Sequence, residues 1–203
     1  MSKSPQFSAR HGIVRGWLAR VFVTIGLLAN LAAWSAEPPG TSTVTEGFIN
    51  TSTAEVWRMF TTAAGYKHVG VAQAEVDLKI GGLIRTHYDP QGQLGDPHTI
   101  VNEILAYEPE RMLTLRIKQP PQGFPYPDAV AGTWTVIYMN PAGDNMTQVR
   151  IIGLGYNDSP QSQAMRKFFS EGNRWTLDRM AKDYWPKCAK CVADEAKAAA
   201  EQR

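Results

Sequence analysis

Cysteine and histidine are scarce in this sequence, and the common signatures of catalytic sites are missing. The chain holds 2 cysteines and 4 histidines among 203 residues. It contains no HExxH zinc motif, no GxSxG nucleophile elbow, no GxGxxG dinucleotide motif and no phosphate-binding P-loop. The motifs therefore identify no catalytic residue, and we expect neither a metal nor a cofactor.

A concentrated basic surface is also lacking. Lysine and arginine number 21 against 19 acidic residues, but Lys3, Arg10, Arg15 and Arg20 all lie in the first 36 residues. The rest of the chain is slightly acidic and has no basic cluster interleaved with aromatics. Such a charge pattern gives no electrostatic support for binding nucleic acid.

No apolar run is long enough for an ordinary transmembrane helix. The longest covers residues 21–33, short of the about 20 residues that a span needs. It follows basic residues and precedes Ala33-Trp34-Ser35, a pattern typical of a signal peptide cleaved before Ala36. Residues 31–33 offer a second cleavage site. We therefore interpret residues 1–36 as a signal peptide that directs export to the periplasm. Two alternatives are an uncleaved N-terminal anchor and a buried helix. The uncleaved anchor is the one way in which we expect the protein to contact a membrane.

The two cysteines stand close together in the tail, residues 186–203. Cys188 and Cys191 form a CxxC pair, which in an oxidising compartment predicts a local disulfide. A redox-active pair would open a helix in a βαβ unit, and a zinc site would need two more ligands nearby. Neither setting is evident, but both alternatives stay open.

Strand patterns dominate between residues 41 and 155. Ser52 to Glu55 is a capping box that predicts a short helix. The later strands are joined by turns such as Asp89-Pro90-Gln91-Gly92, which favours antiparallel neighbours. The predicted strands are 41–50, 74–79, 83–88, 98–107, 112–118, 133–139 and 146–155. An α+β fold is therefore expected, in one domain spanning residues 41–185.

The longest predicted helix follows the strands, at residues 161–184. Its apolar side is broad and rich in aromatics, so it needs a sheet to pack against. Asn173 and Thr176 fall within that apolar side. A few polar groups in an apolar setting are typical of a small-ligand site.

Four segments carry a resemblance to a known family: Ser52–Trp57, Asp77–Gly82, Ile104–Leu113 and Gly172–Met180. With this order and spacing, the chain resembles the START/Bet v 1-like (SRPBCC) superfamily, in the branch of the activator of Hsp90 ATPase homologues. The resemblance implies a helix-grip fold, in which a curved antiparallel sheet of 6–7 strands wraps around the C-terminal helix. It also implies a cavity between sheet and helix.

Strand alternation and the helix face suggest side chains for that cavity, with the strand register left open. Glu103 is ambiguous: facing inward it would be a polar anchor with a raised pKa, and facing outward it would be solvated. The candidate ligand-binding residues are Trp57, Phe60, Tyr88, Glu103, Trp134, Tyr138, Phe169, Asn173 and Thr176.

The favoured function is binding of a small hydrophobic molecule in this cavity. The alternative is an enzyme of the polyketide cyclase or hydrolase kind, for which His87, His98 or Glu103 would supply acid–base groups. His87 and His98 flank one predicted hairpin and lie beside Asp89 and Asp96. The alternative to an acid–base or metal-binding role is that both histidines are ordinary exposed residues at the end of the hairpin. A third possibility is a co-chaperone-like interaction module, which expected export disfavours.

Overall fold

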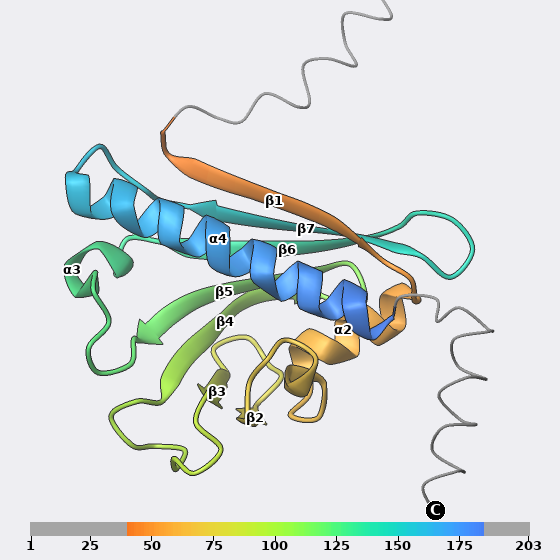
Figure 1. The fold of residues 1–203 in the computed structure, drawn as a ribbon, viewed down its shortest axis with the longest axis horizontal. Coiled ribbons are helices and arrows are strands. Elements are labelled where there is room, and N and C mark those ends of the chain that lie inside the picture. Colours follow the sequence, from red (N-terminus) through yellow and green to blue (C-terminus); the bar gives the residue numbers. More distant parts are fainter. Residues whose placement is uncertain (1–39, 185–203) are drawn as a thin grey trace, which may run out of the picture. The chain divides into compact units, whose positions relative to one another are not determined.

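The structure is a computed structural model that describes residues 40–184. Seven antiparallel strands form one sheet in the order β1-β7-β6-β5-β4-β3-β2, and helix α4 lies across it (Figure 1). The strands are β1 (Ser42–Ile49), β2 (Gln73–Val76), β3 (Leu83–His87), β4 (Ile100–Glu108), β5 (Met112–Gln119), β6 (Trp134–Pro141) and β7 (Thr147–Leu154). The helices are α2 (Thr53–Thr61), the 3₁₀ helix η1 (Gly65–Lys67), α3 (Pro127–Val130) and α4 (Pro160–Asp183).

Helix α4 confirms the long helix expected from the sequence. The Ser159 hydroxyl accepts a hydrogen bond from the Ser162 amide at 3.2 Å, and Pro160 occupies the first turn. The observed helix is within one residue of the predicted one at each end. Together with the antiparallel sheet, it confirms the α+β helix-grip fold.

The main apolar cluster lies under the C-terminal half of α4. Leu177 and Met180 of α4 pack there with Ile137 and Met139 of β6. Helix α2, begun by the predicted Ser52 cap, contributes further buried side chains to the same cluster. This cluster fastens α4 to the sheet near its C-terminal end.

A second, smaller cluster lies at the other end of α4. Val130, Tyr156 and Met165 form its buried centre. The segment leading to α3 adds Phe124, whose ring contacts that of Phe169 in α4 with centroids 6.0 Å apart. The helix is thus packed at both ends by separate groups of apolar side chains.

The register decides which side chains face the helix. Since Ile137 and Met139 pack with α4, the alternation of a strand puts Trp134 and Tyr138 on the outer face of the sheet. The same argument turns Glu103 outward, because it neighbours the inward, fully buried Ile104.

The signal-peptide prediction and the Cys188–Cys191 pair fall outside the described residues. Within residues 40–184, no helix is both long and apolar enough to cross a membrane.

Candidate functional site

The middle of α4 forms the first candidate site. Phe169, Asn173 and Thr176 fall between Met165 and Leu177 around the helix, at the centre of the side that faces the sheet. Met165 and Leu177 are fully buried, yet the three central side chains are only half-buried. Solvent therefore reaches the inward face of α4 between its two packed ends.

The sheet has matching half-buried positions on its inner face. Asn102 pairs with Ile84 and Ile117, while Thr135 pairs with Leu115. Asn102, Ile117 and Thr135 are each half-buried although inner neighbours such as Ile84 and Leu115 are buried. The sequence left the strand register open, and the nine candidates included Glu103, Trp134 and Tyr138 from these strands but not the inner positions.

The remaining candidates lie elsewhere. Trp57 and Phe60 are buried in the main cluster, with the Trp57 ring 6.0 Å from that of Tyr107. Trp134 and Tyr138 are each 40% exposed on the outer face, and Tyr88 is 57% exposed beyond the end of β3. Of the nine, only the three residues on α4 come together at its half-buried centre.

Glu103 forms an ion pair instead of an internal anchor. Its carboxylate lies 2.8 Å from Nη2 of Arg116 on the neighbouring strand. The hydrogen bond from Arg116 is the main influence and lowers the pKa of Glu103 below its usual value, against a smaller opposing effect of desolvation. Of the two alternatives for Glu103, the structure has the outward, ionised one.

His87 and His98 do not form a shared site. His87 is buried; its Nδ1 accepts from the Asp89 amide at 3.0 Å, and its Nε2 lies 3.1 Å from the Asp96 carboxylate. His98 is exposed and contributes only its backbone amide to Asp96, at 2.8 Å. His87 thereby ties together the loop between β3 and β4. Over residues 40–184, no group of three or more His, Cys, Asp or Glu side chains is placed to hold a metal.

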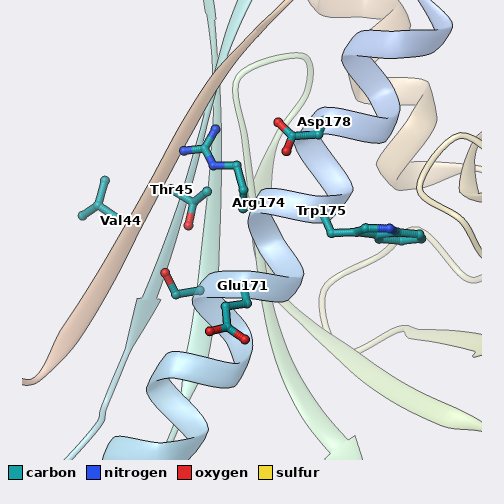
Figure 2. A pocket seen from close by; sticks show the side chains of 7 residues that line it. Val44, Thr45, Glu171, Arg174, Trp175 and Asp178 are labelled. Carbon is teal, nitrogen blue, oxygen red and sulfur yellow. The ribbon is translucent and has the colours of Figure 1, made fainter.

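A separate pocket of about 470 Å³ lies between β1 and α4 (Figure 2). Its lining consists of Val44, Thr45, Ser170, Glu171, Arg174, Trp175 and Asp178, none of them among the nine candidates. The sequence carried a weak signal for it: three charged residues at helical spacing on α4, a pattern that is usually only a solvated face.

The β1 edge of this pocket is held by arginines from α4. Nη1 of Arg174 donates to the Glu46 carbonyl at 2.8 Å, and Nη1 of Arg166 donates to the Ser42 carbonyl at 3.2 Å. Strand β1 is the last strand of the sheet, so these carbonyls would otherwise face solvent. The arginines fix the position of α4 along β1.

Comparisons with known proteins agree with this fold. Residues 50–183 match the family model described as "Activator of Hsp90 ATPase homolog 1-like protein". The search of curated proteins found no match.

Three solved structures illustrate the likeness. A protein from Nitrosomonas europaea is 18% identical with a TM-score of 0.54, and the match covers 72% of this chain and 95% of that one. The Aha1 dimer from Colwellia psychrerythraea is 13% identical, with a TM-score of 0.51 and coverages of 72% and 98%. A protein from Arthrobacter aurescens is 12% identical, with a TM-score of 0.56 and coverages of 72% and 87%. At these identities the likeness concerns the fold alone.

Proposed function

The chain belongs to the Activator of Hsp90 ATPase homolog 1-like family, and on that premise we propose that it binds a small apolar molecule between its sheet and helix α4. The observation that carries the proposal is the half-burial of Phe169, Asn173 and Thr176 at the centre of the inward side of α4. A closely packed core would bury this position most deeply.

The side chains around this centre suit an apolar ligand with one or two polar groups. Phe169 and Ile117 offer apolar surface from the helix and from the sheet. Asn173 and Thr176 offer hydrogen-bond donors and acceptors from the helix. Asn102 and Thr135 offer the same kinds of groups from the sheet. Most of the binding free energy would come from apolar burial, with the polar groups setting orientation.

Binding is better supported than catalysis. None of the six central residues can act as an acid or base near neutral pH. His87 and Glu103, two of the three groups named for the enzyme alternative, are engaged with Asp96 and Arg116, and the third, His98, is exposed.

Fluorescence titration with N-phenyl-1-naphthylamine, a neutral apolar probe, tests the proposal. We expect saturable binding with an increase in emission. Thr176→Phe should fill the space under α4 and weaken binding at least tenfold. Tyr138→Ala removes an aromatic ring from the outer face and should leave binding unchanged.

Two results would contradict the proposal. One is the absence of saturable binding to the unchanged protein. The other is an equal loss of affinity in Thr176→Phe and Tyr138→Ala, which would point to non-specific adsorption on exposed apolar surface.

A further inference from the structure

The pocket between β1 and α4 presents uncommitted hydrogen-bond acceptors. Thr45 is 3% exposed, and its hydroxyl has no hydrogen-bond partner among the described residues. Its side chain lies between β1 and α4, near Arg174 (Figure 2). A buried hydroxyl without a partner is costly, and a donor group of a bound ligand would remove that cost.

The edge of β1 adds a backbone acceptor. The carbonyls of Ser42 and Glu46 point away from β7, since both accept hydrogen bonds from arginines of α4. The two-residue period of a strand turns the carbonyl of Val44 in the same direction. Val44 lines the pocket between those two arginine contacts.

The charge of the pocket is negative. Glu171 and Asp178 of α4 both line the pocket, one before and one after Arg174 along the helix (Figure 2). Arg174 directs Nη1 to the Glu46 carbonyl. Lys167 lies 3.9 Å from Glu171, but both side chains are largely exposed and such a pair contributes little. The lining then carries two carboxylates against one guanidinium.

The spacing of the carboxylates decides between a metal ion and an organic cation. Glu171 and Asp178 are seven positions apart on the helix, which is about 10 Å along the axis. One metal ion cannot bridge that distance, whereas a chain molecule with a positive group at each end can. Each ammonium group also brings three donors and no acceptor, which matches a lining of acceptors.

We propose that the pocket between β1 and α4 is a second binding site, which takes a small aliphatic diamine. One ammonium binds Asp178 and the other binds Glu171, and the Thr45 hydroxyl and the Val44 carbonyl accept further hydrogen bonds. The site is separate from the apolar site under α4, because the two share no residue.

Isothermal titration calorimetry of the full chain with 1,5-diaminopentane tests this site. We expect saturable binding that weakens as salt is added, because the charged groups lie at the surface. Pentylamine has one charge and should bind at least tenfold more weakly. The uncharged 1,5-pentanediol should not bind.

Variants localise the site. Asp178→Asn and Glu171→Gln should each weaken diamine binding about tenfold, and Thr45→Val should weaken it several-fold. Asp144→Asn removes one exposed carboxylate from the β6–β7 turn and should leave affinity unchanged. Thr176→Phe should also leave diamine binding unchanged, while it blocks the apolar probe.

The proposal is overturned if the diamine shows no saturable binding, or if pentylamine binds as tightly. It is also overturned if Asp144→Asn weakens binding as much as Asp178→Asn does, since only general charge attraction would remain. Loss of binding of N-phenyl-1-naphthylamine alone would count against the apolar site and not against this one.

Discussion

Replacing Thr45 by valine should stabilise the ligand-free protein. The two side chains have nearly the same shape and share β-branching, so the strand conformation is retained. The change removes a hydroxyl that is buried without a partner. An unsatisfied buried polar group costs about 1–3 kcal/mol, and a methyl group in its place gains apolar burial. We expect the free energy of unfolding to rise by about 1–2 kcal/mol.

Thr147 provides a matched control on the neighbouring strand. It is fully buried like Thr45, but its hydroxyl donates to the Thr51 carbonyl at 2.8 Å. Thr147→Val breaks that bond and leaves the carbonyl unpaired, which should lower stability by about 1–2 kcal/mol. The same chemical change is thus expected to act with opposite sign at two buried threonines.

Urea unfolding followed by circular dichroism measures both effects. The midpoints should move in opposite directions with an unchanged dependence on urea concentration. In thermal unfolding, each kcal/mol should correspond to about 2–4 °C for a domain of this size. If Thr45→Val loses as much stability as Thr147→Val, the Thr45 hydroxyl is hydrogen-bonded in the free protein and the reasoning about the pocket fails.

Two further predictions concern the packing beside α4. Gly70 has φ +87° and a Cβ there would collide with the Trp175 ring, whereas Gly81 has φ +77° with open space around it. Gly70→Ala should therefore lower stability by about 1–3 kcal/mol and by more than Gly81→Ala in urea unfolding, and equal losses would exclude the Trp175 contact as a cause. Burial, helped by the nearby Tyr88 phenol, raises the pKa of Tyr66. Its contribution to stability is complete below the ordinary tyrosine pKa of about 10 and is lost as pH rises above it. Tyr66→Phe should reduce the alkaline slope of stability by up to about 1.4 kcal/mol per pH unit between pH 10 and 11, and an unchanged slope would contradict the assignment.

Local patterns predicted the elements well because each rests on neighbouring residues. The Ser52 cap precedes α2 as expected, with its hydroxyl accepting from the Glu55 amide at 3.3 Å. The strand at 74–79 is shorter than expected and ends at Val76. The backbone turns there, with the Lys79 amide bonded to the Asp77 carbonyl at 2.9 Å. The alternation of apolar and polar residues continues beyond Val76, where the pairing of the strand with its neighbour stops.

The side chains of the candidate site were harder to predict. Alternation shows that two faces exist but does not say which one meets the helix. Trp134 and Tyr138 alternate with the inward Ile137 and Met139, so the register places them on the outer face. Glu103, whose direction the sequence left open, also faces outward. On α4, by contrast, the broad apolar side included Phe169, Asn173 and Thr176, and these residues lie on the inward side because a helix has only one side to bury.

The α+β class, the order of the strands along the chain and the inward side of the last helix could be inferred from the amino-acid sequence, because they follow from local periodicity and capping. The faces of the strands, the half-burial at the centre of α4 and the pocket beside β1 became evident only in the folded chain. These features depend on strand register and on how far α4 stands from each strand. The partnerless Thr45 hydroxyl is of this kind, since its cost arises only when β1 and α4 come together around it.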